Sequence, residues 1–407
     1  MGLNDTPSGE RVHIGLYGRT NVGKSSLING IANQEIAMVS NLKGTTTDPV
    51  YKAMELLPMG PVVLMDTPGL DDDSQLGKQR IQKSYQLINK TDIGILVTDG
   101  INPLTEIELE LINRFRQKNI PFLIVVNKAD QLVNNSEDVF STQILPQMAQ
   151  QVLFVSALNK EDMIRLRNEI AKTFISNGDE KFLVRDLMAK GDKIVLVIPI
   201  DKAAPKGRLI LPQQQTIREI LDGDGIVIMA KEDQLESIIS ENESQIRMVI
   251  TDSQVFEQVE KIVPREIPLT SFSILFARYK GELEQLVKGA QRIDELPNDC
   301  EILISEGCSH HRQCGDIGSE KLPNWIRKAT NKKCNFTFTS GTQFPEDLSR
   351  FHLIIHCGGC MLNEREVKYR LACAADAKIP MTNYGIAIAH MNGILLRTIE
   401  VFPEIRK

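Results

Sequence analysis

The chain has 407 residues, a length that predicts two or three domains at roughly 150 residues each. Hydrophobic residues make up 42% and charged residues 25%, proportions typical of globular proteins that bury substantial cores. The net charge of -6 argues against a protein that binds nucleic acid mainly by neutralising phosphates. No segment approaches the roughly 18 apolar residues of a membrane-spanning helix, and the first residues lack a signal-peptide core, so we expect a cytoplasmic protein without membrane contact.

The cysteines are confined to the end of the chain. All 7 lie at or after Cys300, and five of the 6 histidines lie at or after His310. A secreted disulfide scaffold is short and spreads its cysteines over the whole chain, so that class is excluded. Soft ligands gathered in the last quarter predict a metal or redox module joined to a part that needs no thiols.

Short apolar runs alternate with helical stretches over residues 12–174. The runs are Val12–Tyr17, Val62–Met65, Ile93–Thr98, Pro121–Val126 and Val152–Val155. Strands that alternate with helices predict βαβ units and a parallel sheet covered on both faces. We therefore expect residues 1–178 to form a doubly wound α/β domain.

The first run leads directly into the pattern G-x-x-x-x-G-K-S, which starts at Gly18 and is followed by a predicted helix, Ser26–Ala32. Its glycines let backbone N–H groups surround phosphates at a helix N-terminus. Lys24 is expected to reach the β- and γ-phosphates, and Ser25 is expected to offer its hydroxyl to Mg²⁺. The loop predicts a nucleoside triphosphate site.

Further motifs follow other strands of this domain. Asp66-Thr-Pro-Gly69 closes the second run, where the aspartate would hold Mg²⁺ through water and the Gly69 N–H would meet the γ-phosphate. Asn127-Lys128-Ala-Asp130 closes the fourth run, and its aspartate can accept hydrogen bonds from a guanine edge that adenine does not offer. Motifs in this order at the carboxyl ends of strands predict a GTPase domain.

The residues of this domain resemble the translation-factor-related GTPases of the Era and TrmE type. Gly44-Thr-Thr-Thr-Asp48 is similar to the switch I sequence of that group, with Thr47 in place of the usual arginine. The resemblance implies Thr46 as a ligand of Mg²⁺ and the γ-phosphate, with Thr45 as the alternative. The residues expected in catalysis are Lys24, Thr46, Asp66 and Gly69. The residues expected to contact GTP are Gly18, Asn21, Gly23, Lys24, Ser25, Ser26, Thr46, Asp66, Gly69, Asn127, Lys128, Asp130, Ser156 and Ala157.

Leu70 occupies the position at which Ras-like enzymes carry a water-orienting glutamine. Leucine cannot hydrogen-bond the attacking water, so we expect slow intrinsic hydrolysis unless another group stabilises the transition state. Related GTPases without this glutamine use a K⁺ ion bound through the P-loop asparagine, and Asn21 stands at the matching position. The alternative interpretation of Asn21 is a simple turn former.

Residues 182–264 predict a small α/β domain. Its expected strands are Lys193–Ile200, Gly225–Ala230 and Ile246–Thr251. A sheet of three strands buries little surface and leaves its edges open, so pairing with a second copy of the chain is one physical remedy.

Residues 268–407 again alternate between strands and helices, which predicts a third domain with a parallel sheet. Its expected helices include Arg278–Ile293 and a closing helix through Ile386–Glu400. Two of its strands, Glu301–Ser305 and Leu353–His356, run directly into metal-ligand motifs. The motifs read C-x-H at Cys308–His310 and, after 45 residues, H-C-x-x-C at His356–Cys360. Because functional residues of parallel sheets lie beyond the carboxyl ends of the strands, we expect the two motifs to form one site.

The thiols of Cys308, Cys357 and Cys360 form a soft site that suits Zn²⁺ or an iron–sulfur cluster. One histidine would complete a closed zinc site, whereas a [4Fe–4S] cluster on three cysteines leaves one iron for a fourth, exchangeable ligand. The candidates for that position are Glu306, His310 and His356. Spacing alone favours neither metal. The cysteines expected to be small core residues are Cys300, Cys314, Cys334 and Cys373, of which Cys314 is near enough to join the site.

The order of these domains, ending in the C-x-H and H-C-x-x-C motifs, resembles the HydF family of [FeFe]-hydrogenase maturation GTPases over essentially the whole chain. The resemblance implies dimerisation through the middle domain and a [4Fe–4S] cluster on Cys308, Cys357 and Cys360. It also implies a scaffold or carrier that receives a di-iron precursor from two radical-SAM maturases and passes it to the hydrogenase apoprotein. GTP hydrolysis would regulate these partner contacts.

The alternative function is a GTPase of ribosome or tRNA metabolism with a zinc-stabilised appendage. That function requires a basic RNA-binding surface, which the net charge of -6 supports little but does not exclude locally. The two hypotheses differ in the metal that the protein carries.

Overall fold

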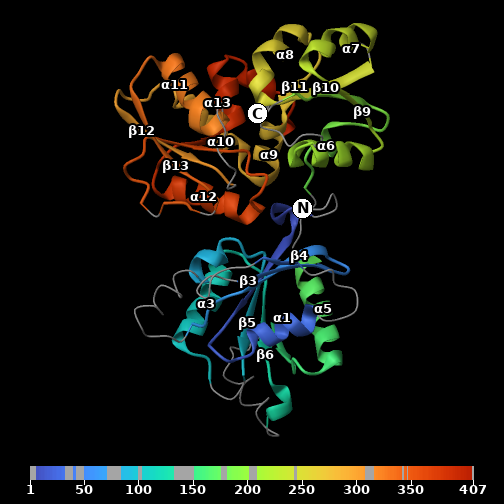
Figure 1. Cartoon of the computed structure of the whole chain (residues 1–407), viewed down its shortest axis with the longest axis vertical. Coiled ribbons are helices and arrows are strands. Elements are labelled where there is room, and N and C mark those ends of the chain that lie inside the picture. Colours follow the sequence, from blue (N-terminus) through green and yellow to red (C-terminus); the bar gives the residue numbers. More distant parts are fainter. Residues whose placement is uncertain are drawn as a thin grey trace. The chain divides into compact units, whose positions relative to one another are not determined.

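The computed structural model describes residues 6–32, 40–42, 50–70, 84–99, 103–132, 151–175, 181–200, 209–242, 245–307, 316–341, 343–345 and 347–405. The chain divides into two compact units, Met1–Asp179 and Glu180–Lys407, and the colours of Figure 1 follow the chain through both.

The first unit is built on a sheet with the strand order β2-β3-β4-β1-β5-β6-β7. The strands are β1 (Val12–Tyr17), β2 (Ser40–Leu42), β3 (Val50–Leu56), β4 (Gly60–Asp66), β5 (Ile93–Thr98), β6 (Phe122–Val126) and β7 (Val152–Phe154). β1 lies between β4 and β5 and is parallel to both, and β6 and β7 continue the parallel sheet. The doubly wound α/β fold predicted from the sequence is confirmed.

Helices cover both faces of this sheet (Figure 1). α1 (Lys24–Ala32) and α5 (Lys160–Ile175) bury apolar residues such as Ile31 in one hydrophobic core. α3 (Glu106–Gln117) buries Phe115 and its neighbours in a second core on the opposite face. Both faces of the strands are therefore covered, which is why they read as continuous apolar runs.

The strand β3 has no counterpart among the sequence predictions. It pairs antiparallel with β4 over Val50–Leu56, on the side of the sheet away from β5. Polar residues such as Lys52 and Glu55 interrupt its apolar residues, because a strand near the edge of a sheet keeps part of its surface in water. The prediction from continuous apolar runs therefore could not find it.

The second unit contains two wholly parallel sheets with the orders β11-β10-β8-β9 and β13-β12-β14-β15. The first, called the middle sheet here, holds β8 (Lys193–Val197), β9 (Ile226–Ala230), β10 (Ile246–Thr251) and β11 (Leu269–Ser271). The second, called the C-terminal sheet, holds β12 (Cys300–Ser305), β13 (Cys334–Thr339), β14 (Leu353–His356) and β15 (Met381–Asn383).

Two sequence predictions were wrong at the middle sheet and directly after it. The middle sheet has four strands rather than three, because β11 adds to β10; with only three residues it is too short to give a periodic signal. A single helix was expected after it, over Arg278–Ile293. The structure instead has α9 (Phe272–Lys280) and α10 (Leu283–Gln291), which are separated where Gly281 adopts an extended conformation.

One hydrophobic core joins the two sheets of the second unit. It includes Leu196 of the middle sheet, Phe272 and Ile274 of α9, and Ile354 of the C-terminal sheet. α9 contacts helices that belong to both sheets, among them α6 and α12, and Figure 1 shows it in the centre of the unit. The middle sheet therefore gains a buried face within its own chain.

The other helices pack around these sheets. They are α6 (Leu211–Asp222), α7 (Leu235–Asn242), α8 (Phe256–Ile262), α11 (Leu322–Thr330), α12 (Glu364–Asp376), α13 (Tyr384–Met391) and α14 (Leu395–Ile399). A π-helical turn, Ile317–Lys321, precedes α11. The last two helices were expected as one, but Gly393, with φ of +72°, separates them.

Replacing Gly289 by Ala should destabilise the second unit. A Cβ at this position of α10 would lie 1.9 Å from the carbonyl oxygen of Met381 in β15, so the backbones would have to move apart. Overpacking of this kind costs about 1–3 kcal/mol, and we expect a lower midpoint in thermal unfolding followed by circular dichroism. The neighbouring exposed Lys288→Ala is the control. An unchanged midpoint in Gly289→Ala would contradict this packing.

Candidate functional site

The P-loop follows β1 and ends in the first turn of α1. Lys24 is buried, and its Nζ donates hydrogen bonds to the carbonyl oxygens of Gly18 (2.8 Å) and Arg19 (2.7 Å). A Cβ on Gly18 would lie 2.2 Å from the carbonyl oxygen of Val97, and a Cβ on Gly23 would lie 2.2 Å from an amide nitrogen. Both glycines also have positive φ, so only glycine fits this loop.

The expected Mg²⁺ ligands meet at the adjacent strand end. The Ser25 hydroxyl donates to Asp66 Oδ2 at 2.5 Å, which brings together the P-loop and the end of β4. Thr67 anchors the following segment, because its hydroxyl donates to the Leu16 carbonyl at 2.7 Å. Gly69 is half-buried just beyond. Thr46 lies outside the described residues.

Asn127 connects three of the predicted motifs. Its amide nitrogen donates to the Val22 carbonyl in the P-loop at 2.9 Å, and its amide oxygen accepts from the Ala157 N–H at 3.1 Å. Lys128 reaches the same loop, since its Nζ donates to the Asn21 carbonyl at 2.8 Å. Asn127 thus fixes the loops around the base site.

The base side of the site remains open to solvent. Asp130 is exposed in a short turn after β6. The loop after β7 is held in place because the Ser156 N–H donates to Asp162 Oδ2 at 2.8 Å. A carboxylate at this place can accept two hydrogen bonds from a guanine edge.

Leu70 faces away from the nucleotide motifs. Its side chain is 1% exposed and packs in the core with Tyr17, Ile88 and Phe115. The residue at the position of the water-orienting glutamine therefore belongs to the hydrophobic core. It offers no polar group to an attacking water.

The C-x-x-C loop begins where β14 ends. β12 and β14 are neighbours, with Ser305 opposite His356, so the two metal-ligand motifs leave adjacent strands. Cys357 Sγ accepts hydrogen bonds from the N–H groups of Gly307 (3.0 Å) and Gly359 (3.4 Å). The chain that leads to Cys308 thus contacts Cys357 directly.

The two thiols of this loop lie in a low-dielectric setting. Burial raises the pKa of Cys357, against the opposing effect of the Gly307 and Gly359 N–H groups. Burial raises the pKa of Cys360 to about 11, and the neighbouring Cys357 adds to that rise. Two thiols on one loop, with N–H donors on the Cys357 sulfur, fit a metal or cluster that binds thiolates.

His356 is locked by hydrogen bonds on both ring nitrogens. Arg370 Nη1 donates to Nε2 at 3.0 Å, so Nδ1 carries the proton and donates to the Cys357 carbonyl at 2.7 Å. Burial, together with the Arg370 charge, lowers the pKa of His356 to about 3. The imidazole is neutral, and neither nitrogen is open to a metal in this arrangement.

Arg370 is a fully buried cation behind the same loop. Its guanidinium pairs with Glu366 (2.9 and 3.0 Å) and donates to the Ser305 hydroxyl (3.1 Å) and the Gly341 carbonyl (2.8 Å). A buried charge is tolerated when it is paired and hydrogen-bonded. Arg370 therefore ties His356 to the ends of β12 and β13.

Glu306 lies at the end of β12 and accepts a hydrogen bond from the Tyr384 hydroxyl at 3.1 Å. Its side chain also approaches Gly318, where a Cβ would lie 2.3 Å from Glu306 Oε1. Cys308, His310 and Cys314 lie outside the described residues. Among the residues that the structure does describe, no three His, Cys, Asp or Glu side chains gather as a metal site.

The remaining described cysteines lie in or against the core of the second unit, as the sequence predicts. Cys300 and Cys334 are buried and face each other in the register of β12 and β13, and Cys373 packs against the same core. Burial raises the pKa of Cys300 to about 12. A raised pKa fits a core role for Cys300 rather than that of a ligating thiolate.

Sequence reasoning missed three cations that shape the sites. Arg19 binds Asp99 and the buried Glu108 of α3 at 3.3 Å each, and Arg370 and Lys280 contact the C-x-x-C loop. Arg19 occupies a variable position of the P-loop pattern, and no motif includes Arg370 or Lys280. Apart from the Arg370–Glu366 pair, which lies four residues apart on α12, these contacts join different elements and depend on the tertiary structure.

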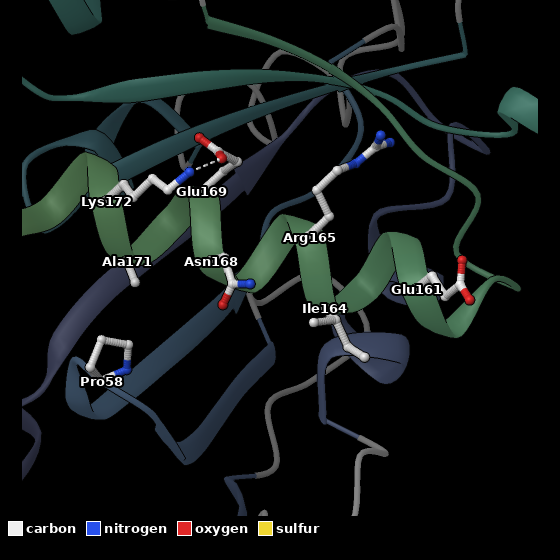
Figure 2. Close-up of a pocket in the computed structure, with 8 residues that line it drawn as sticks. All are labelled: Pro58, Glu161, Ile164, Arg165, Asn168, Glu169, Ala171 and Lys172. Carbon is white, nitrogen blue, oxygen red and sulfur yellow. Dashed lines mark hydrogen bonds and ion pairs between the residues drawn. The ribbon is translucent and has the colours of Figure 1, made fainter.

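A separate pocket of about 490 Å³ lies on the first unit. Figure 2 shows Pro58 on one side of it and the side chains of α5 on the other. It is lined by Pro58, Glu161, Ile164, Arg165, Asn168, Glu169, Ala171 and Lys172. These lining residues include none of the predicted nucleotide ligands.

In the part of the chain that the structure describes, no helix is both long and apolar enough to cross a membrane.

Comparison with known proteins identifies the second unit. Residues 183–281 match the family model of the Hydrogen maturase F dimerization domain, and residues 284–401 match that of the Hydrogen maturase F tetramerization domain. Together the matches cover more than half of the chain. The chain belongs to the hydrogen maturase F family. The first unit is a GTPase domain, because residues 13–128 match the 50S ribosome-binding GTPase model. This result agrees with the domain order predicted from the sequence.

Individual relatives cover less of the chain. The tRNA modification GTPase MnmE of Nitrosomonas eutropha is 34% identical over 168 residues, 40% of this chain and 35% of the relative. The GTPase Der of Clostridium perfringens is 34% identical over 144 residues, 34% of this chain and 32% of the relative. The matches thus span about a third of the length of these curated relatives. Among solved structures, the G domain of the T. maritima FeoB iron transporter is 26% identical, covers 40% of this chain and 99% of its own, and has a TM-score of 0.29.

Replacing Asp130 by Asn should weaken the preference of this hydrogen maturase F family member for guanine nucleotides. The substitution replaces one carboxylate oxygen with an NH₂ group, which donates where the guanine edge needs an acceptor, and it removes the negative charge. Hydrogen bonds to charged groups contribute about 1.5–3 kcal/mol. We expect GTP affinity to fall about 10- to 100-fold, measured by titration calorimetry. Asp162→Asn, which alters the loop behind the site, is the comparison. Unchanged GTP binding in Asp130→Asn would contradict the assigned base site.

Proposed function

We propose that this protein is a GTPase and iron–sulfur scaffold for [FeFe]-hydrogenase maturation in the cytoplasm. The observation that carries the proposal is the C-x-x-C loop beside Gly307, within the hydrogen maturase F domains and in one chain with a GTPase domain. The proposed domains are residues 1–178 for GTP, 182–264 for dimerisation and 268–407 for the cluster. The sheet of the middle domain is completed by β11, which comes from the segment that follows residue 264.

The proposed metal group is a [4Fe–4S] cluster held by Cys308, Cys357 and Cys360. The Gly307 N–H on Cys357 Sγ supports this set, because Gly307 directly precedes Cys308. When bound on three cysteines, such a cluster leaves one iron with an exchangeable position. Since His356 uses both ring nitrogens, we propose that the fourth ligand comes from His310 or Glu306.

The proposed role is to receive a di-iron precursor from radical-SAM maturases and to pass it to the hydrogenase apoprotein. Family membership supports this role. The chain's own residues contribute a loop that orients two thiols and a GTPase domain whose nucleotide state would regulate partner contacts. We infer no nucleic-acid partner, because the net charge of -6 offers no general attraction to phosphates.

We further propose that the chain forms homodimers through the middle sheet. β9 is an edge strand of that sheet and exposes Ile226 and Met229, which are 46% and 56% exposed. An edge with apolar side chains and unpaired backbone groups is a ready site for pairing with a second strand. The match to a dimerization domain over residues 183–281 supports this interface.

The decisive experiment for the cluster is reconstitution of the protein with iron and sulfide without oxygen. We expect a [4Fe–4S] absorption and EPR spectrum in the wild type and its loss in Cys357→Ala, with GTP turnover largely retained because the two sites are in different domains. Cys373→Ala, outside the motifs, should keep the cluster. A colourless wild type that holds one tight zinc would support the ribosome- or tRNA-related alternative instead.

We propose that K⁺ bound through Asn21 accelerates GTP hydrolysis. Leu70 is buried and cannot orient water, whereas Asn21 is exposed at the P-loop with a left-handed backbone. We expect turnover about tenfold or more faster in K⁺ than in Na⁺ buffer, within the range that a transition-state cation can supply. Asn21→Ala should remove the difference. Equal rates of the wild type in both buffers would refute the K⁺ site.

A further inference from the structure

Lys280 is a buried ammonium group at the C-terminal end of α9. Its side chain is 3% exposed. Nζ donates to the carbonyl oxygens of Leu362 (2.7 Å), Cys360 (3.2 Å) and Gly359 (3.4 Å). An ammonium has three N–H donors and no acceptor, so the C-x-x-C loop and the residues after it offer a matching set of acceptors. The Phe276 ring, one turn earlier on α9, has its centroid 5.6 Å from Nζ.

The direction of these carbonyls decides where the N–H groups of the loop point. In a trans peptide the C=O and the following N–H point in opposite directions. Because the Gly359 and Cys360 carbonyls face Lys280, the N–H groups of Cys360 and Met361 face the other way. N–H groups directed at thiolates and sulfides are one of the means by which proteins stabilise iron–sulfur clusters.

The same helix links the loop to the middle sheet. α9 starts directly after β11, where the Ser271 hydroxyl accepts a hydrogen bond from the Ile274 N–H. A nine-residue helix therefore runs from the middle sheet to the ammonium that holds the C-x-x-C loop. Burying a charge is costly unless its hydrogen bonds are made. The buried position of Lys280 is therefore favourable only while the loop carbonyls accept hydrogen bonds from its Nζ.

We propose that Lys280 is a positioning residue of the cluster site, which fixes the C-x-x-C loop for ligation and adds a fixed positive charge beside it. The inference rests on the proposed function, since it requires the thiols to hold a cluster. It extends that function by assigning a residue outside both metal-ligand motifs. In this proposal, α9 couples the middle sheet to the C-x-x-C loop.

A fixed positive charge has a measurable electrostatic effect. Reduction adds negative charge to a cluster, and a nearby cation stabilises the reduced form. Removing the Lys280 charge should therefore shift the midpoint potential to more negative values. A residue that only fills space would not produce this shift when its replacement has similar volume.

The experiment compares full-length Lys280→Met, Lys280→Arg and wild type after reconstitution with iron and sulfide. Lys288→Met, at an exposed site paired with Glu284, is the matched control. We expect Lys280→Met to bind iron about 10-fold or more weakly in competition with a chelator, as is typical for residues that support metal ligands. Its midpoint potential should be more negative, whereas Lys280→Arg and Lys288→Met should stay close to wild type.

Thermal unfolding of the cluster-free proteins separates positioning from folding. A cluster-free Lys280→Met that unfolds like wild type while losing iron supports the proposal. Equal iron retention and equal potential in Lys280→Met and wild type would overturn it. Loss of the fold in both Lys280→Met and Lys280→Gln would also overturn it, because Lys280 would then be a general core residue. A wild type that takes up no cluster would refute the proposed function itself.

Discussion

The parallel pairing of β12 with β14 is the constraint on which the proposed cluster site depends. Its register sets Ser305 opposite His356, so the chain leaves both strands at the same edge of the sheet. Gly307 can then reach Cys357 Sγ with its N–H at 3.0 Å. A slip of one residue would turn the side chains of one strand to the opposite face, and the two halves of the site would separate.

Two buried cations fix the conformation of the loop that this register creates. Arg370 approaches it from α12 and holds His356, while Lys280 approaches from α9 and holds the loop carbonyls. Buried ions contribute little net stability, because desolvation offsets their attraction. The ions instead fix geometry, because an ion whose acceptors move away loses the hydrogen bonds that offset the cost of its desolvation. The loop is thereby confined to one conformation by groups from two different helices.

The loops of the nucleotide site are held together differently from the C-x-x-C loop. Its loops are connected by neutral side-chain amides and backbone groups, with Asn127 bonded to both the P-loop and the Ala157 N–H. The Ser25 hydroxyl and the Asp66 carboxylate, the proposed oxygen ligands of Mg²⁺, are hydrogen-bonded to each other. Hard oxygen ligands suit Mg²⁺, and thiolates suit iron and zinc. With the proposed cluster, this difference would account for a GTPase domain without cysteine and a C-terminal part that contains all of them.

The sequence by itself determined the doubly wound GTPase domain, its motifs and the pair of strands that carry the cysteines, because these depend on local periodicity and fixed spacing. It could not find β3 or β11, whose signals are interrupted or too short, nor the break between α9 and α10. Only the tertiary structure decided that His356 is occupied on both nitrogens and that Lys280 faces the C-x-x-C loop. The Lys280 contact joins residues 82 positions apart and the Arg370 contact joins two different elements, and no local pattern records which acceptor a buried cation will meet.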